Sequence, residues 1–313
     1  MQPEARSIAV QISYRPPFPV QEMFGFLAAR AVKGVEEGDM HYYRRALTLA
    51  NGAGVVTVRQ GTPHTLSCTF LLDDSRDLAV AVRKVERLFD TGAEPSAITD
   101  ALGGDRLIGH EVVSNPGRRV PGHVDGSELA IRAILGQQVS IDAARSLAAR
   151  LSLLHGRQLA TPVGTVCQEF PSAAAIAALG EDDVPVPRAR ARALVELAGA
   201  LTRGLCLDPP ADNDAVEQQL LAIAGIGPWT VAYVRMRALG DRDAFLASDL
   251  GVRRALEQLG EYGGVRQARD LAERWRPYRA YALQYLWSIA SRARVQKDVT
   301  GAVGRGKSVP RPT

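Results

Sequence analysis

Residues 220–236 read LLAIAGIGPWTVAYVRM, two apolar helical repeats joined through a pair of glycines. Gly225 and Gly227 let the backbone turn through conformations that larger residues avoid, and Pro228 suits the first position of a helix because its missing N–H needs no partner there. Without side chains, the glycines also let a phosphate reach the N–H groups at the start of the second helix. The segment is therefore either an ordinary hairpin of two helices or a phosphate-binding one.

Helical patterns flank this hairpin on both sides, from Ser127 onward. Ser140 is a typical N-cap, and Gly156 ends the apolar stripe that follows it. Apolar residues at helical spacing predict helices over residues 127–138, 140–156, 172–180, 187–204, 214–223, 227–240, 249–260, 265–275 and 278–294. This part of the chain is predicted to be helical throughout.

The first hundred residues carry a different, β-rich pattern. Turn signals at Asn51-Gly52 and Gly61-Thr62-Pro63 separate three segments that predict an antiparallel meander. The expected strands cover residues 7–14, 41–50, 54–60 and 64–72, and the expected helices cover residues 20–34 and 77–90. The Gly- and Pro-rich stretch over residues 103–126 is predicted to be a linker.

Together these patterns predict an α+β N-terminal domain, an antiparallel sheet with two helices, followed by an all-α body. A length of 313 residues agrees with two domains at roughly 150 residues each. We expect the first domain to cover residues 1–110 and the helical body to cover residues 111–297. The Gly- and Pro-rich tail over residues 298–313 is expected to be disordered.

Composition argues against several other classes of protein. No apolar run approaches the ~18 residues needed to span a bilayer, and the N-terminus lacks the layout of a signal peptide. Cys68, Cys167 and Cys206 lie far apart, and the five histidines form no HxH or HxxxH pair, so neither zinc nor an iron–sulfur cluster is expected. We therefore expect a cytoplasmic protein with no membrane partner.

Positive charge is concentrated in the C-terminal part of the chain. Residues 1–109 hold 12 basic and 13 acidic side chains, whereas residues 240–313 hold 14 basic and 8 acidic ones. With an isoelectric point near 9.1, this distribution weakly indicates a polyanionic partner such as nucleic acid.

GIGPWTVAY, followed about twenty residues later by FLASDLGVRR, resembles the helix–hairpin–helix DNA glycosylases, and most closely the 3-methyladenine DNA glycosylase II (AlkA-like) group. The β-rich N-terminal domain of that group is resembled by five short motifs, GFLAAR, YYxR, GVVT, HTL and RLFD. Its helical body is resembled by three more, RAILGQxVS, AERWxP and YALxxxW. The similarity covers residues 8–295 in consistent order. It implies an enzyme that flips alkylated purines out of double-stranded DNA and hydrolyses the N-glycosidic bond during base excision repair.

Asp249 occupies the position of the catalytic aspartate of this family. As the base departs, positive charge builds on the deoxyribose, and a carboxylate near C1′ stabilises that charge and can orient or deprotonate the attacking water. From the residues alone, Asp249 is an N-cap for the helix over residues 251–259. The two roles are compatible, because a helix start also favours a negative charge. The preceding residue is Ser248, which leaves Asp249 as the carboxylate of this segment.

Trp229 stands where bifunctional relatives carry a lysine that forms a Schiff base with the sugar. An indole has no amine, and the four lysines, Lys33, Lys84, Lys297 and Lys307, are all distant from the hairpin in sequence. The resemblance therefore implies a monofunctional enzyme that uses water as its nucleophile.

By the same resemblance, aromatic residues line the pocket for the flipped base, and their electron-rich rings attract a cationic alkylated purine. Taken singly, each of these residues could be a core residue. Leu250 belongs to the pocket too, although the closest relatives have an aromatic residue there. The aromatic members are Phe26, Trp229, Tyr233 and Trp287.

Other DNA contacts are expected at the hairpin and between two helices of the body. Gly225, Gly227 and Thr230 would present N–H groups to one phosphate. Gln138 stands where relatives can carry an apolar wedge that fills the gap left by the flipped base, and it could also be a polar residue at a helix end. A monovalent cation could also bind beside this phosphate. The backbone carbonyls that would hold it are those of Leu221, Ile223 and Gly225.

The resemblance thus implies a monomer that binds alkylated double-stranded DNA, is associated with the nucleoid when bound, and needs no other cofactor. Two alternatives stay open: a non-catalytic helix–hairpin–helix DNA-binding protein, and a bifunctional glycosylase–lyase. The lesion is also open, with 3-methyladenine, 7-methylguanine, hypoxanthine and ethenoadenine all compatible with the residues.

Overall fold

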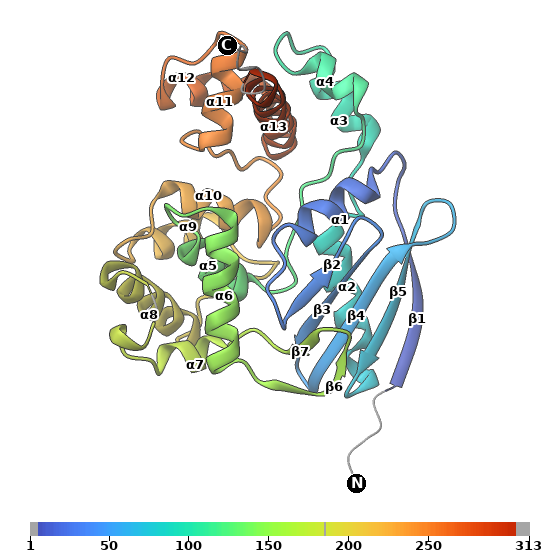
Figure 1. Cartoon of the computed structure of the whole chain (residues 1–313), viewed down its shortest axis with the longest axis vertical. Helices are drawn as coiled ribbons and strands as arrows, with labels where there is room; N and C mark the ends of the chain where they lie inside the picture. The colour runs from blue at the N-terminus through green and yellow to red at the C-terminus, as the bar shows by residue number, and fades with distance from the viewer. Residues whose placement is uncertain (1–5, 185, 305–313) are drawn as a thin grey trace, which may run out of the picture.

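A five-stranded antiparallel sheet forms the N-terminal part of the structure, with strands in the order β1-β5-β4-β3-β2 (Figure 1). This computed structural model describes residues 6–184 and 186–304, and the side chains of residues 7–184 and 186–292. The elements are β1 (Arg6–Ser13), α1 (Val20–Ala28), β2 (Glu36–Gly38), β3 (Tyr42–Leu49), β4 (Gly52–Gln60), β5 (Thr65–Leu72) and α2 (Leu78–Phe89). The predicted meander is β3-β4-β5, to which the structure adds β1 and the short β2.

Period-two burial explains why these segments pair as strands. In β5, Leu66, Cys68 and Phe70 are fully buried, whereas Ser67 and Thr69 between them are not. Alternate side chains of a strand point to opposite faces of a sheet, so the apolar set of β5 faces one side. That side packs with the apolar stripes of α1 and α2 into one cluster.

The rest of the described chain is helical apart from one hairpin. Each helix expected between residues 127 and 294 is present, which confirms an α+β part followed by a helical body. Ser140 caps its helix as expected, because its Oγ accepts a hydrogen bond from the Ala143 N–H at 3.2 Å. The helices are α3 (Pro95–Leu102), α4 (Gly109–Ser114), α5 (Gly126–Leu135), α6 (Ile141–His155), α7 (Ala173–Ala177), α8 (Arg188–Thr202), α9 (Asn213–Leu221), α10 (Pro228–Arg237), α11 (Leu250–Gln258), α12 (Val265–Ala272) and α13 (Arg279–Gly304).

Two expectations about the body are wrong. Residues 158–168 form the hairpin β6 (Gln158–Val163) and β7 (Val166–Gln168) rather than helix or coil. The Gly34 carbonyl accepts hydrogen bonds from the N–H groups of Cys167 at 2.8 Å and Gln168 at 3.1 Å, so contacts with the distant N-terminal part support this hairpin. The predicted linker over residues 103–126 contains α4, whose Val112 is buried against other helices whereas Val113 is exposed.

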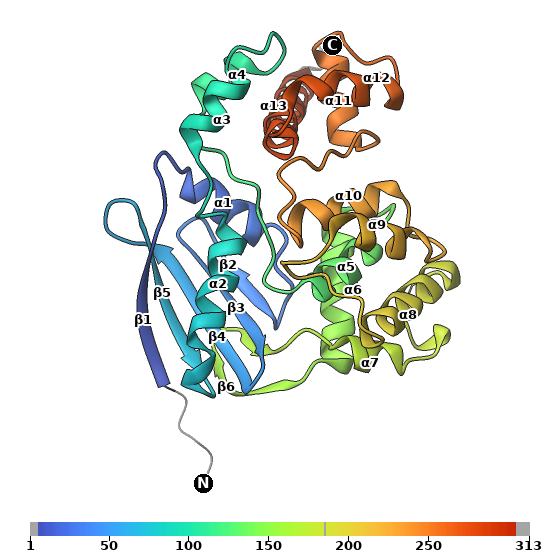
Figure 2. The same cartoon turned by 180° about the vertical axis from the view of Figure 1, so that it is seen from behind.

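The apolar core of the described chain divides into three clusters. One belongs to the sheet with α1 and α2, and the second joins α5–α10 to Ala46, Ala53 and Val55 of β3 and β4. The third joins Ile98 and Val112, from α3 and α4, to residues of α11, α12 and α13. Figure 2 shows α3 and α4 beside α13, as Figure 1 does from the other side. The predicted boundary at residue 110 falls within α4 and stays a prediction.

The C-terminal helix is longer than expected. α13 continues to Gly304, beyond the expected end at residue 294. The disordered tail over residues 298–313 stays a prediction, and residues 305–313 lie outside the described part of the chain. Among the described helices, none combines the length and the apolar character that crossing a membrane requires.

Candidate active site

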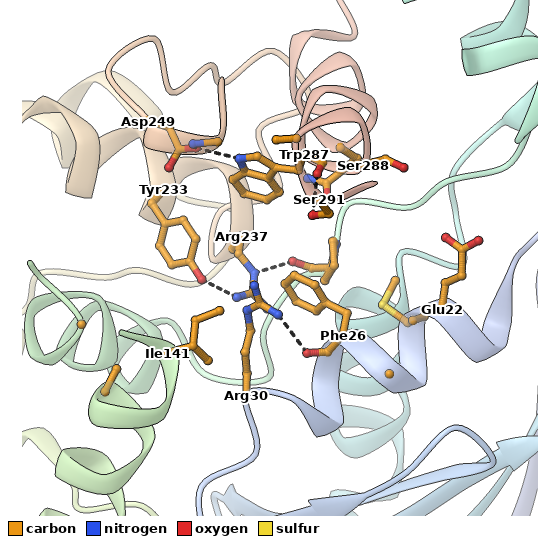
Figure 3. A pocket seen from close by; sticks show the side chains of 18 of the residues that line it. Glu22, Phe26, Arg30, Ile141, Tyr233, Arg237, Asp249, Trp287, Ser288 and Ser291 are labelled. Carbon is orange, nitrogen blue, oxygen red and sulfur yellow. Dashed lines mark hydrogen bonds between the residues drawn. The ribbon is translucent and has the colours of Figure 1, made fainter. Parts of the chain in front are cut away.

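A cavity of about 890 Å³ lies between α1 of the N-terminal part and helices α5, α6, α10, α11 and α13 of the body (Figure 3). Its wall brings together residues that are more than 200 positions apart in sequence. The predicted catalytic residue and all the predicted pocket residues line it, namely Asp249, Phe26, Trp229, Tyr233, Leu250 and Trp287. The rings of Trp229 and Tyr233 are stacked, with centroids 5.1 Å apart and an interplanar angle of 10°.

Asp249 is both a helix cap and a wall residue of the cavity. Its Oδ1 accepts hydrogen bonds from the N–H groups of Gly251 at 2.8 Å and Val252 at 3.2 Å, at the start of α11. These bonds use two N–H groups that have no partner within the helix. The cap thus holds the carboxylate in one orientation at the edge of the cavity.

Two indole rings also donate to this carboxylate. Trp287 Nε1 lies 2.8 Å from Asp249 Oδ1, and Trp229 Nε1 lies 3.0 Å from Asp249 Oδ2. Oδ1 therefore accepts three hydrogen bonds from described residues and Oδ2 accepts one. Since a carboxylate oxygen has two lone pairs, Oδ2 is the oxygen that retains a lone pair for a further partner. The sequence identified both tryptophans as aromatic wall residues, but their donor role depends on tertiary geometry.

Gly251, which the sequence analysis did not single out, lies close to both Trp287 and Asp249. A Cβ atom built there would lie 2.7 Å from Trp287 Cδ1 and 3.0 Å from Asp249 Oδ1. The missing side chain therefore allows the indole to reach the carboxylate. A glycine in the first turn of a helix lowers the stability of the helix relative to alanine. An unfavourable residue at this place is the feature of the sequence that could have pointed to a close contact at Gly251.

If the chain has the base-excision activity that the resemblance implies, we expect Gly251→Ala to lower its rate by about tenfold or more, because losing a hydrogen bond to a charged group costs ~1.5–3 kcal/mol. The added methyl group would push Trp287 away from Asp249. Single-turnover kinetics measure the effect, and Trp287→Phe is the matched variant, since it removes the indole N–H but leaves Gly251. Full activity in both variants would contradict this role for the indole.

The floor of the cavity carries two arginines that the sequence analysis did not single out. The Arg30 guanidinium carbon lies 3.8 Å from the centroid of the Phe26 ring. Arg237 donates to the Tyr233 hydroxyl at 2.5 Å and to the carbonyls of Pro121 at 2.7 Å and Gly122 at 3.0 Å. Burial raises the pKa of Tyr233, but the charges of Arg237 and Arg30 outweigh it, so this pKa lies below its usual value.

A buried network of ion pairs lies behind the cavity. Arg45 pairs with Glu36 at 3.0 Å and with Glu128 at 2.6 Å. Arg132 pairs with the same two carboxylates at 3.0 and 2.8 Å, and its Nη2 donates to the Arg30 carbonyl at 2.7 Å. The network thus connects β2 and β3 to α5 and to the end of α1. Glu36 and Glu128 lie near His123 in an arrangement that could hold a metal ion, but the two arginines already supply the positive charge.

The hairpin lies at the junction of α9 and α10, outside the cavity wall. Gly225 has φ +93°, a conformation that favours glycine, and Gly227 is the N-cap of α10. Gln137 Nε2 donates to the Gly225 carbonyl at 3.0 Å and to Thr230 Oγ1 at 3.2 Å. This pair of bonds fixes the loop against the turn that follows α5. Gln138, in that turn, is exposed and adopts φ +57°.

The carbonyls predicted to hold a monovalent cation are partly engaged. The Gly225 carbonyl accepts from Gln137, and the Ile223 carbonyl accepts from the Ile226 N–H at 3.1 Å. A carbonyl oxygen has a second lone pair, so these groups and that of Leu221 remain chemically suited to a cation.

Comparison with known proteins identifies relatives of this chain. A family model described as the AlkA N-terminal domain matches residues 9–125. Over 281 residues the chain is 35% identical to DNA-3-methyladenine glycosylase 2 of Escherichia coli (strain K12). The aligned region covers 88% of this chain and 95% of that protein. It is 41% identical over 285 residues to a probable bifunctional transcriptional activator/DNA repair enzyme AlkA of Mycobacterium tuberculosis, covering 91% of this chain. The chain spans only 57% of the length of that relative.

Solved structures share the fold. A 3-methyladenine DNA glycosylase from Archaeoglobus fulgidus superposes with a TM-score of 0.78 at 23% identity, covering 90% of this chain and 98% of that one. An 8-oxoguanine glycosylase/lyase from Clostridium acetobutylicum, in complex with double-stranded DNA, gives a TM-score of 0.69 at 18% identity, covering 87% and 92%. The 35% identity over nearly the whole E. coli protein shows that the chain belongs to the DNA-3-methyladenine glycosylase 2 (AlkA) family.

Proposed function

We propose that this chain is a monofunctional DNA glycosylase that flips alkylated purines out of double-stranded DNA and hydrolyses their N-glycosidic bonds. The observation that carries the proposal is the Asp249 carboxylate, which four N–H groups orient at the wall of a cavity lined by aromatic rings. A cavity of this size accommodates a flipped base together with its sugar. The aromatic walls supply the stacking surfaces that a base outside the duplex requires.

Asp249 is the group that we assign to the reacting sugar. As the bond to the base lengthens, the deoxyribose becomes cationic, and a fixed negative charge stabilises it without having to reorient. Oδ1 is taken by the cap and by Trp287, so Oδ2 is the oxygen that would face the sugar or the attacking water. This division lets one carboxylate serve as both cap and catalyst.

The residues around Asp249 support water as the nucleophile. Among the described side chains that line the cavity there is no lysine, and Trp229 occupies the wall beside Asp249. A Schiff base requires an amine. Borohydride treatment during turnover should therefore trap no covalent protein–DNA complex, and the strand should remain uncut at the abasic site. Efficient trapping would instead establish a glycosylase–lyase.

We propose that the hairpin binds one phosphate of the DNA through N–H groups at Gly225, Gly227 and Thr230. A monovalent cation held by carbonyls of the same loop would add positive charge beside that phosphate. Gln138 is exposed in the turn after α5, next to cavity-lining residues, and we propose that it fills the gap left by the flipped base. The protein would act as a monomer, since these groups all belong to one chain.

Gly227→Leu is expected to weaken binding to undamaged duplexes of different sequence alike, by about tenfold, because phosphate contacts carry no base information. A Cβ at Gly227 would meet no atom within 4 Å, so the fold tolerates a side chain that would obstruct the phosphate. Gly92→Leu is the matched control, since a Cβ there also meets nothing and the position belongs to the connection between α2 and α3. Fluorescence anisotropy measures both, and a loss that depends on DNA sequence would contradict the assignment.

A further inference from the structure

Arg190 differs from the other arginines at the start of α8 in having no acidic partner. Arg188 lies 3.1 Å from Asp182, and Arg192 lies 2.9 Å from Glu181. Within the described side chains, Arg190 forms no ion pair, although it is half-buried and lies between the two. Its positive charge is therefore left for a partner outside the chain.

The guanidinium group of Arg190 also has donors to spare. An arginine carries five N–H donors, and among the described acceptors only the Leu135 carbonyl lies within reach, at 3.5 Å from Nη1. A hydrogen bond of that length is weak. Leu135 is the last residue of α5, so the guanidinium group lies at the start of the turn that carries Gln138.

The first turn of α8 is packed against the hairpin loop as well. A Cβ atom built at Gly225 would lie 3.1 Å from Ala193 Cβ and 3.9 Å from the Ala189 carbonyl oxygen. Figures 1 and 2 both show α8 next to α9, the helix that leads into the hairpin. Arg190 therefore lies near two groups that we assign to DNA, the hairpin and Gln138.

The turn between α5 and α6 lies between Arg190 and the cavity. Gly136, Val139 and Ser140 of this turn line the cavity, whereas Arg190 does not. A base that is flipped out of the duplex moves to the cavity side of the turn, and the opposite strand stays stacked. Arg190 approaches the turn from outside the cavity, on the side where that strand would lie.

From this placement we infer that Arg190 binds a backbone phosphate of the strand opposite the flipped base. The planar guanidinium group suits a phosphate, to which it can donate two parallel hydrogen bonds. The inference rests on the proposed function and extends it, since the groups assigned there include none for the second strand. It also supplies a contact that forms only with double-stranded DNA.

Arg190→Met is the informative variant, and Arg192→Met is the matched control because Arg192 is paired with Glu181 on the same helix. Fluorescence anisotropy compares a duplex that carries one uncleavable abasic-site analogue with the analogue-bearing strand alone. We expect Arg190→Met to weaken duplex binding by about tenfold, the size of one charge-assisted hydrogen bond, and to leave single-strand binding unchanged. The slope of log K against log salt concentration should fall by about 0.9 for the duplex.

Two comparisons separate this effect from a loss of folding. Arg192→Met should change neither the duplex affinity nor the salt slope. Arg190→Lys keeps a positive charge and should retain part of the duplex affinity, which a merely structural defect would not allow. Equal losses for duplex and single strand in Arg190→Met would overturn the inference, and so would an unchanged duplex affinity.

Neutral methylphosphonates, placed at one phosphate at a time in each strand, identify the contacted group. At that phosphate the wild-type protein should lose about tenfold in affinity, whereas Arg190→Met should lose nothing further, because the two changes remove the same contact. We expect this position in the strand opposite the abasic analogue. A position in the strand that carries the analogue, or additive losses at every position, would overturn the inference.

Base release is measured separately, so that the inference and the proposed function can fail independently. With saturating protein, Arg190→Met should release 7-methylguanine at close to the wild-type rate, because Arg190 does not line the cavity. If the contact with the opposite strand is found but the wild-type protein releases no base, the inference holds and the proposed function fails. If base is released but Arg190→Met binds the duplex like wild type, the proposed function stands and the inference fails.

Discussion

Replacing Asp249 with asparagine is expected to slow base release by about 10²–10³-fold, the loss typical of removing one preorganised electrostatic group. The amide keeps the shape of the side chain, and its oxygen still accepts from the N–H groups at the start of α11 and from Trp287. What is lost is the negative charge that stabilises the sugar cation. Single-turnover release from a duplex with one 7-methylguanine measures the effect, and a rate within threefold of wild type would refute the catalytic role.

One structural detail requires a second variant. In Asp249→Asn the amide nitrogen would face Trp229 Nε1, now 3.0 Å from Oδ2, and two donors would oppose each other. Adding Trp229→Phe removes the opposing donor. If charge is the cause, the double variant stays as slow as the single one and both bind DNA nearly as well as wild type. Recovery in the double variant would attribute the loss to displacement of the indole.

Arg45→Met is expected to lower the free energy of unfolding by ~3–5 kcal/mol, because it leaves buried carboxylates with one guanidinium between them. Arg45, Glu36 and Glu128 have side chains that are 2%, 4% and 6% exposed, so water cannot replace the lost partner. Urea denaturation measures the change. Arg59→Met, an exposed arginine on the neighbouring strand β4, is the control and should change stability little.

A loss below about 1 kcal/mol for Arg45→Met would mean that the pair contributes no more than a surface ion pair. The network would then be ruled out as the main connection between the sheet and the body. Because Arg132 also donates to the Arg30 carbonyl, a destabilised network should disturb the pocket floor as well.

Much of the fold could be predicted because its signals are local. The helices from α5 to α13 have apolar positions at helical spacing, and several, such as α5, α6 and α11, begin at a capping side chain. β3, β4 and β5 are separated by turn residues that join neighbouring strands. β6 and β7 have no such signal, since they depend on hydrogen bonds to Gly34, more than 120 residues earlier. α4 was obscured by the glycines and prolines that flank it.

The candidate site also has one part that local sequence predicts and another part that depends on tertiary packing. Asp249 and the aromatic residues lie in motifs, and the structure brings all of them to one cavity. The indole N–H groups, the close approach at Gly251 and the paired charges of Arg30 and Arg237 exist only once α1, α10, α11 and α13 have packed together. No pattern within one segment encodes the position of Arg30 and Arg237 at the same Phe26 ring.

Chromatography of the bases released from a methylated duplex, with the DNA strand analysed on a denaturing gel, tests the central claim most directly. The claim is that the chain removes alkylated purines by hydrolysis at Asp249 and leaves the backbone intact. We predict free 3-methyladenine and 7-methylguanine with the wild-type protein, strands that are cut only after alkaline treatment, and almost no free base with Asp249→Asn. Absence of any released base from the wild-type reaction, or strands cut without alkali, would contradict the account.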